Sequence, residues 1–284
     1  MKSCPYCGKE YTDDVTNCSI DGESLRGINP QHLIPGEPID EALPDKSAPY
    51  LTFPDYQWSA KDAWKCLGMI SVLTLMTGLI LGIIIFALHP SASAWQSWKT
   101  NGYYYCLKSI LSYAALLLPT VFFARTKTFA TFASGFGLDC KISNYAWFGV
   151  TVALIIRCHG HFYGWGNISS YDMISFKNTA SFDRYFFLVP LVLLAPFFEE
   201  VVARGFLYKA FRGSYSMEIC MALIVALTII THWPQCHHSP SATVDLSVLT
   251  VVQCYLREKS VSLWDCILSH FAFNASLLGV ATLK

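Results

Sequence analysis

The chain has 284 residues, of which 53% are hydrophobic, 15% are aromatic and only 14% are charged. Soluble proteins carry about 25% charged residues, so this deficit, with a mean hydropathy of +0.38, indicates an integral membrane protein. The formal net charge is zero, which argues against nucleic acid as a partner. Most of the eleven cysteines lie in apolar segments, where cysteine acts as a small hydrophobic residue, so they do not suggest a disulfide framework.

Residues 1–26 carry cysteines at the spacing of a zinc site. Cys4 and Cys7 form a CxxC pair, and Cys18 begins a second pair in which Asp21 replaces the last cysteine. Tetrahedral zinc takes such ligands from short turns, and the stretch resembles the zinc-ribbon modules at the ends of many bacterial proteins. We therefore expect a structural zinc ion here. The expected ligands are Cys4, Cys7, Cys18 and Asp21, with His32 as the alternative fourth ligand.

Two other readings of this cysteine pattern stay open. The module could be a ribbon that has lost its metal, or the CxxC pair could be a redox site. The redox reading is disfavoured because no βαβ pattern follows the pair.

Residues 27–60 contain six prolines among polar residues. Repeated proline keeps a chain extended, so this segment is predicted to be a linker.

The remaining residues, 61–284, read as a polytopic membrane domain. Because about 20 apolar residues cross a bilayer, the apolar segments predict an all-α fold with about seven transmembrane helices. These segments are 67–88, 106–124, 143–156, 184–211, 217–233, 244–256 and 261–280. A polar loop, about 157–183, separates the third from the fourth.

The positions of lysine and arginine predict an orientation. Cytosolic loops of membrane proteins are enriched in these residues, and the balance of the loops favours a cytosolic N-terminus. The alternation is imperfect, because the loop at 157–183 is as basic as any loop on the other side. A reducing cytosol also suits a thiolate zinc site. We expect the protein in the plasma (inner) membrane of a bacterium.

The fourth apolar segment contains three charges within six residues. A charge in hydrocarbon costs at least ~2.5–3.5 kcal/mol and is normally functional. Glu200 and Arg204 are four residues apart, which favours an ion pair on one helix face. Glu199 lies about 100° away around the helix, so it is free for other work. An ion pair that only locks helices together is the structural alternative. Two prolines, Pro190 and Pro196, could open this helix near a polar cavity.

Three further polar residues occur in later apolar segments. His232 lies near the end of the fifth segment, and His270 and Asn274 share one helix face in the seventh. His232 alone would be a packing residue. Together with the two glutamates, these residues could activate a water molecule and stabilise an oxyanion.

These residues carry a resemblance to a known family. EEVVARGFLY fits the EExxxR signature of the CPBP family of intramembrane proteases, which is similar to the type II CAAX prenyl endopeptidases and includes bacteriocin-processing and self-immunity proteins. His270 and Asn274 fit its HxxxN motif, and His232 fits the histidine of FxxxH, where Thr228 replaces the phenylalanine. The resemblance covers about 185–278.

The resemblance implies a role for each residue. Glu199 would be the general base on the hydrolytic water, with His232 beside it. His270 and Asn274 would bind the oxyanion, or hold a metal if the family is read as metalloproteases, while Glu200 and Arg204 would order the site. The implied substrate is a peptide or protein at the membrane, with or without a lipid group. The alternatives are a scaffold or self-immunity protein without proteolytic activity and, less favoured because no inverted repeat is visible, a small-solute transporter.

Overall fold

The computed structural model describes residues 2–3, 10–16, 26–27, 58–88, 91, 102–125, 132–162, 189–260 and 262–282. The chain divides into two compact units, Met1–Tyr56 and Gln57–Lys284. The boundary falls inside the segment that the sequence predicts to be a linker.

The first unit contains a small antiparallel sheet. Its strands are β1 (Lys2–Ser3), β2 (Glu10–Tyr11) and β3 (Arg26–Gly27), in the order β2-β1-β3. Lys2 pairs with Tyr11 on one side and with Gly27 on the other. The predicted zinc ligands Cys4, Cys7, Cys18 and Asp21, and the alternative ligand His32, lie outside the described residues, so the zinc site stays a prediction.

The second unit is helical in all its described secondary structure. Its elements are α1 (Ala60–Leu88), α3 (Gly102–Arg125), α4 (Phe132–Phe136), α5 (Tyr145–Phe162), η2 (Val189–Leu194), α8 (Ala195–Glu200), η3 (Val201–Leu207), α9 (Tyr208–Arg212), α10 (Met217–Thr231), α11 (Trp233–His238), α12 (Pro240–Lys259) and α13 (Trp264–Thr282). A helix is present at each of the seven apolar segments, although their boundaries differ from those predicted.

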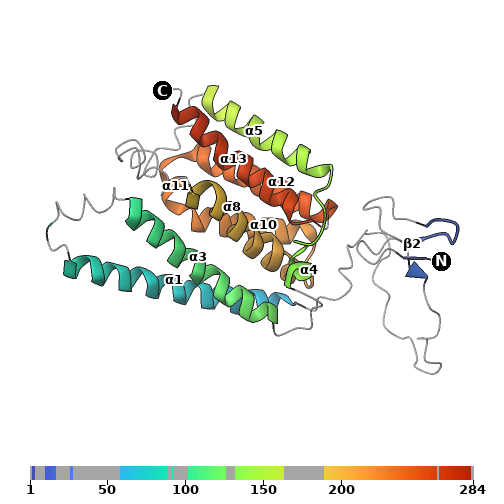
Figure 1. Cartoon of the computed structure of the whole chain (residues 1–284), viewed down its shortest axis with the longest axis horizontal. Coiled ribbons are helices and arrows are strands. Elements are labelled where there is room, and N and C mark those ends of the chain that lie inside the picture. The colour runs from blue at the N-terminus through green and yellow to red at the C-terminus, as the bar shows by residue number, and fades with distance from the viewer. Residues whose placement is uncertain are drawn as a thin grey trace. The chain divides into compact units, whose positions relative to one another are not determined.

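The helices of this unit form three layers. The α1–α3 hairpin, which we define as α1 together with α3, forms one layer, and α13 packs against α5 and α12 in another (Figure 1). The continuous helix of η2, α8, η3 and α9 lies between them, because α8 contacts both α3 and α13. The segment that carries the EExxxR motif is therefore central in the unit.

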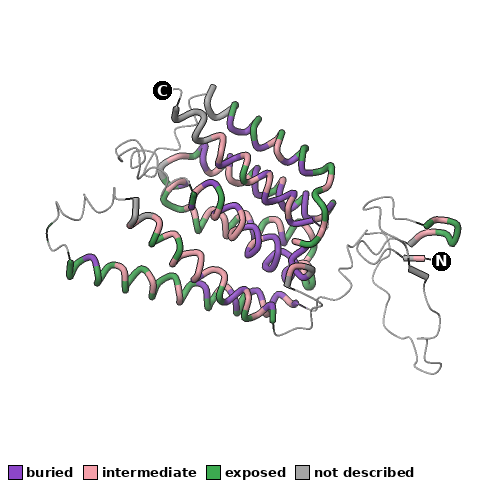
Figure 2. The backbone as a smooth tube through the Cα atoms, viewed as in Figure 1, coloured by how far each residue is buried: buried purple, intermediate pink, exposed green. Residues whose placement is uncertain are grey.

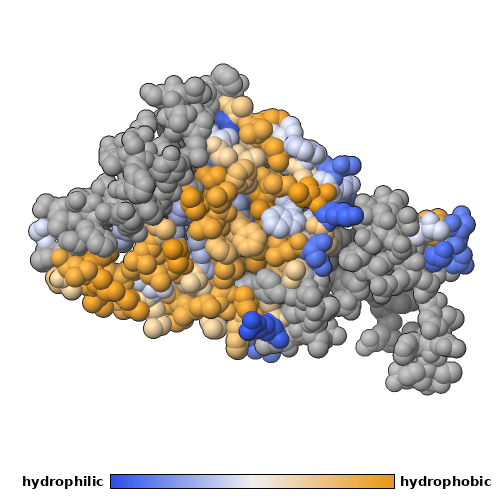
Figure 3. Space-filling view, viewed as in Figure 1, coloured by the Kyte–Doolittle hydropathy of each residue, from blue (hydrophilic) through white to orange (hydrophobic). Residues whose placement is uncertain are grey.

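The surface of this unit suits a bilayer. Two described helices, Ala60–Leu88 and Cys106–Arg125, are long and apolar enough to cross a membrane, and their apolar windows are only 11% and 17% buried. The core helix of a soluble protein would be mostly buried. Figure 2 shows the exposed residues along α1 and α3, and Figure 3 shows apolar side chains over much of the visible face. Tyr145–Cys158 and Met217–Thr231 are shorter apolar helices, and the number of seven spans stays a prediction.

Two glycines mark close contacts in this unit: Gly149 within the layer of α5, α12 and α13, and Gly205 between the central helix and α4. A Cβ at Gly149 would lie 2.6 Å from Leu256 Cδ1 and 3.0 Å from Ser269 Cβ. A Cβ at Gly205 would lie 2.6 Å from Phe136 Cδ1. Glycine is favoured at both positions, because a Cβ would force these neighbouring side chains to move.

Candidate functional site

The central helix changes its hydrogen-bond pattern twice around the EExxxR motif. η2 and η3 are π-helical, and α8, which carries both glutamates, is a short α-helical segment between them. The backbone stays helical at the second junction, with φ −70° and ψ −38° at Glu200. Because π-helical turns are rare and often occur at functional sites, the two π segments mark α8 as a specialised part of the fold.

A proline explains why one carbonyl of η2 lacks its helical hydrogen-bond partner. In the π pattern the carbonyl of Leu191 would accept from the N–H of residue 196, which is proline and has no N–H. Asn274 Nδ2 donates to this carbonyl over 2.9 Å. Tyr113 Oη donates to the neighbouring Pro190 carbonyl over 3.3 Å. Pro190 and Pro196 therefore leave the helix continuous, and side chains of α13 and α3 satisfy its carbonyls.

Glu200 is the most deeply engaged residue of the motif. Its side chain is 0% exposed, and Oε1 accepts from Arg204 Nη1 over 3.0 Å. This is the ion pair that the four-residue spacing predicts. His270 Nδ1 lies 2.8 Å from the same oxygen and donates to it, since a carboxylate oxygen can only accept. Oε2 is buried and has no hydrogen-bond partner within the described part of the chain. Glu200 thus joins the first and third motifs.

Glu199 lies in a different environment from its neighbour. It is half-buried, and no described residue gives it a hydrogen bond or an ion pair. The side chain before it, Phe198, packs on Tyr113 of α3 with ring centroids 5.3 Å apart. The 100° rotation between successive helical residues accounts for the difference between the two glutamates. Glu199 is therefore the carboxylate available to a water molecule or substrate.

His232 ends α10 and is held by that helix. It is the C-cap residue, and its Nδ1 lies 3.0 Å from the Thr228 carbonyl, to which it donates. The neighbouring Thr231 hydroxyl is 3.2 Å from the same nitrogen. No hydrogen bond or ion pair joins His232 to Glu199 among the described residues. In both His232 and His270 the Nδ1 proton is committed to protein, which leaves Nε2 for other chemistry.

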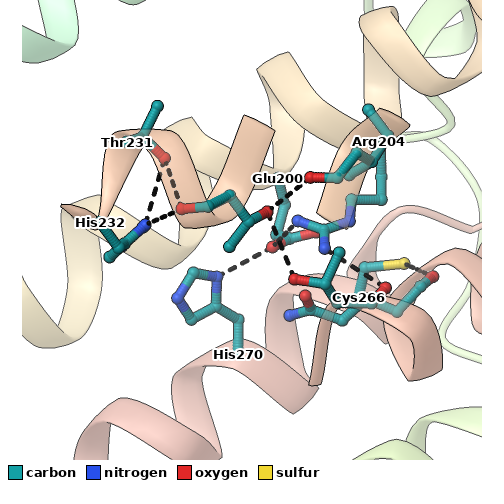
Figure 4. A network of polar contacts seen from close by, with 10 residues as sticks. Glu200, Arg204, Thr231, His232, Cys266 and His270 are labelled. Carbon is teal, nitrogen blue, oxygen red and sulfur yellow. Dashed lines mark hydrogen bonds and ion pairs between the residues drawn. The ribbon is translucent and has the colours of Figure 1, made fainter. Parts of the chain in front are cut away.

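A chain of polar contacts links His232 to the glutamate (Figure 4). The Thr250 hydroxyl donates to the Thr228 hydroxyl over 3.3 Å, and Arg204 Nη2 donates to the Thr250 carbonyl over 3.5 Å. Thr228 stands where the resemblance expects phenylalanine. In the structure its hydroxyl bonds to α12, so the substitution adds a polar link between α10 and α12.

Next to the site, the four consecutive carbonyls of residues 135–138 accept hydrogen bonds from residues that are distant in sequence. Lys209 Nζ donates to the Gly135 carbonyl over 2.8 Å, and Arg257 Nη2 donates to that of Phe136 over 3.1 Å. The Gly137 carbonyl accepts from the Leu263 N–H, and the Leu138 carbonyl accepts from Trp264 Nε1. The end of α4 and the two residues after it are thus tied to α9, to α12 and to the start of α13.

The segment after α4 contains a cysteine outside the apolar helices. Burial, together with the negative charge of Asp139, raises the pKa of the Cys140 thiol to about 11. This thiol is therefore protonated at neutral pH and is a poor nucleophile.

Asp265, at the start of α13, accepts hydrogen bonds from both the N–H and the hydroxyl of Ser143. These bonds join the start of α5 to the start of α13.

Several residues of this site were missed or misplaced from the sequence. Arg157 was assigned to a polar loop, but α5 continues past it to Phe162, and its side chain is 7% exposed. Its guanidinium carbon lies 4.5 Å from the centre of the Phe273 ring. Lys209, near the end of the fourth apolar segment, and Arg257, directly after the sixth, are also buried. These three cations therefore carry little information about orientation. In the sequence, the only signal for the burial of these cations was their position at the edge of an apolar segment.

No cluster of three histidine, cysteine, aspartate or glutamate side chains that could hold a metal ion occurs among the residues with described positions. The two free imidazole nitrogens and the Glu199 carboxylate are donor types that zinc accepts. They come from the C-cap of α10, from α13 and from α8, and they form no such cluster in the described part of the chain.

The part of the chain that carries these motifs matches a known family. Residues 181–276 match the model described as type II CAAX prenyl endopeptidase Rce1-like. This match supports the CPBP family. It covers about a third of the chain and includes the central helix, α10, α12 and most of α13. Neither a curated protein nor a solved structure matches the chain. The α1–α3 hairpin and the first unit lie outside the matched Rce1-like segment.

Proposed function

We propose that the chain is an intramembrane endopeptidase of the CAAX type that hydrolyses a peptide bond with a water molecule activated by Glu199. The observation that carries this proposal is the different environment of the two glutamates. Glu200 is fully buried and bonded to Arg204 and His270, whereas Glu199 is half-buried and has no hydrogen bond or ion pair with a described residue. A general base must reach the proton that it removes, so the unengaged carboxylate is the better candidate.

In the proposed reaction Glu199 takes a proton from water while the water oxygen bonds to the peptide carbonyl carbon. The carbonyl oxygen then carries the negative charge of the tetrahedral intermediate. Breakage of the C–N bond restores the carbonyl, and Glu199 returns the proton to the leaving amine. His232, whose Nδ1 is bonded to its own helix, would use Nε2 to hold the attacking water.

The developing oxyanion needs hydrogen-bond donors. The second amide hydrogen of Asn274 is one such donor, since the first is bonded to the Leu191 carbonyl. His270 can donate from Nε2 only when both ring nitrogens carry protons, and Glu200 would be the counter-ion of that imidazolium. Arg204 would balance the charge of Glu200. These roles make Glu200 and Arg204 positioning residues.

The test compares wild type with Glu199→Gln and Glu200→Gln on quenched peptides with and without a prenyl group. We expect Glu199→Gln to lower the cleavage rate by about 10²–10⁴-fold, the usual contribution of a general base, and to keep the thermal unfolding temperature. Glu200→Gln should lower both the rate and that temperature, because it leaves the Arg204 charge buried without its counter-ion.

A Glu199→Gln protein that cleaves as fast as wild type would contradict the assignment of the base. A Glu199→Gln protein that keeps the cellular function would instead favour the scaffold or self-immunity alternative, which needs the fold and not the reaction. Cleavage of prenylated peptides alone would narrow the substrate class to lipidated proteins.

We propose zinc in the N-terminal unit on the sequence pattern of Cys4, Cys7, Cys18 and Asp21. Metal content should fall by about one zinc per chain when Cys4→Ser and Cys7→Ser are combined. Zinc that stays bound to this variant would belong to the membrane unit and would favour the metalloprotease reading. We also propose a cytosolic N-terminus, which labelling of intact cells with a membrane-impermeant maleimide would contradict if these cysteines reacted.

A further inference from the structure

The α1–α3 hairpin contains a groove that the proposed reaction does not use. Its cavity has a volume of about 220 Å³. Residues of α1 form one wall, namely Thr74, Thr77, Gly78, Leu81, Gly82 and Ile85, and residues of α3 form the other, namely Tyr104, Lys108 and Ser112. The hairpin lies outside the segment matched by the Rce1-like family, so this groove is independent of the catalytic proposal.

The dimensions of the groove suit one hydrocarbon chain. Thr74 and Ile85 mark its extent along α1, a length of about 17 Å at 1.5 Å per residue. The hydrocarbon core of a bilayer is about 30 Å thick, so one leaflet contributes about half of that. A Cβ at Gly78 or Gly82 would meet no atom within 4 Å. The glycines therefore face open space and not a packed neighbour.

Among the described residues that line the groove, one is charged and none is acidic. The charged residue is Lys108, an exposed residue seven positions into α3. No aspartate or glutamate occurs between residues 63 and 138, which includes the whole connection between the two helices. None of the residues with described positions gives Lys108 a hydrogen bond or an ion pair. Its exposed ammonium group is therefore available to an anion from outside this part of the chain.

We propose that the groove binds one anionic phospholipid, with an acyl chain along the glycine face of α1 and the phosphate on Lys108. A lysine close to the end of a spanning helix extends its ammonium group to the headgroup level. Tyr104 lies one turn closer to the end of α3, and tyrosine is enriched at that level. A neutral isoprenoid chain would fill the apolar part of the groove and leave the lysine without a counter-ion.

The test measures lipid binding to the purified full chain in detergent by native mass spectrometry. The probes are phosphatidylglycerol and phosphatidylcholine with identical acyl chains. We expect phosphatidylglycerol to bind at least fivefold more tightly, because one basic residue at an anionic surface contributes about 1 kcal/mol. Lys108→Gln should remove this preference. Lys65→Gln, which changes an exposed lysine at the opposite end of α1, should keep it.

A second pair of variants tests the position of the acyl chain. Gly82→Leu should fill the groove and weaken binding of both lipids by about tenfold or more. Gly68→Leu is the matched control, because its Cβ also meets nothing within 4 Å but the residue does not line the groove. Both changes raise helix propensity, so both proteins should fold.

Three results would overturn the proposal. They are equal affinity of wild type for the two lipids, equal losses for Lys108→Gln and Lys65→Gln, and unchanged phosphatidylglycerol binding in Gly82→Leu. Farnesol that displaced the lipid from wild type and Lys108→Gln with equal ease would assign the groove to an uncharged chain instead.

Discussion

The α1–α3 hairpin and the layer of α5, α12 and α13 are both apolar, but they use small residues in opposite ways. Gly68, Gly78 and Gly82 of α1 face open space, whereas Gly149 of α5 is in contact with the side chains of two other helices. The hydroxyl of Ser71 bonds within its own helix, to the Leu67 carbonyl. The hydroxyl of Ser269 bonds between helices, to the Gly149 carbonyl.

This difference shows that an apolar sequence can be used for two purposes. In the hairpin, the apolar surface is mostly exposed, as suits a surface in contact with a bilayer. In the other layer, close contact between helices excludes lipid, and the buried polar groups must find partners within the protein. The central helix borders both regions, and two of its charged residues contact the second one: Glu200 bonds to His270 of α13, and Arg204 bonds to the Thr250 carbonyl of α12.

The largest expected effect comes from breaking the buried ion pair. Arg204→Met leaves the fully buried Glu200 carboxylate without its cation, and losing one partner of a buried pair costs about 3–5 kcal/mol. We expect a large fall in the thermal unfolding temperature in detergent. The matched control is Arg125→Met, an exposed arginine at the end of α3, which should change the unfolding free energy by less than about 0.5 kcal/mol. Similar losses for both variants would contradict this assignment.

One added methyl group is expected to change the unfolding free energy less, and in opposite directions in the two regions. Gly149→Ala places a Cβ 3.0 Å from Ser269 Cβ, and such overpacking costs about 1–3 kcal/mol. Gly68→Ala meets nothing and should stabilise α1 by up to about 1 kcal/mol through helix propensity. Unfolding in detergent measures both, and a stabilised Gly149→Ala protein would show that the two layers do not differ.

The two serines give a finer comparison. Ser269→Ala removes a buried hydrogen bond of 3.0 Å between helices and should cost about 1 kcal/mol. Ser71→Ala removes a bond of 2.9 Å within an exposed part of α1. It should be nearly neutral, because the Leu67 carbonyl keeps its helical partner. The same unfolding measurement applies, and equal costs would contradict the distinction.

The smallest effect is expected for the N-terminal unit. Combining Cys4→Ser with Cys7→Ser should change the unfolding temperature of the membrane unit by no more than the experimental error. The reason is that residues Met1–Tyr56 form a compact unit separate from Gln57–Lys284. A lower temperature would mean that the N-terminal unit stabilises the membrane unit.

The sequence by itself determined the class of protein and the pairing within the central motif. Apolar runs of sufficient length predicted helices at seven places, and a helix is present at each. The four-residue spacing selected Glu200 as the partner of Arg204, and the pair is present. Both inferences depend on local periodicity, which the chain carries in its own order of residues.

Tertiary structure decided the properties that depend on distant neighbours. It turned the Asn274 side chain to the Leu191 carbonyl and brought His270 to Glu200. It also buried Arg157 against the Phe273 ring, although the sequence predicted a loop there. The separation of two residues along the sequence does not predict which helices become neighbours. That choice follows from packing, because Gly149 and Gly205 admit neighbouring elements that a Cβ would exclude.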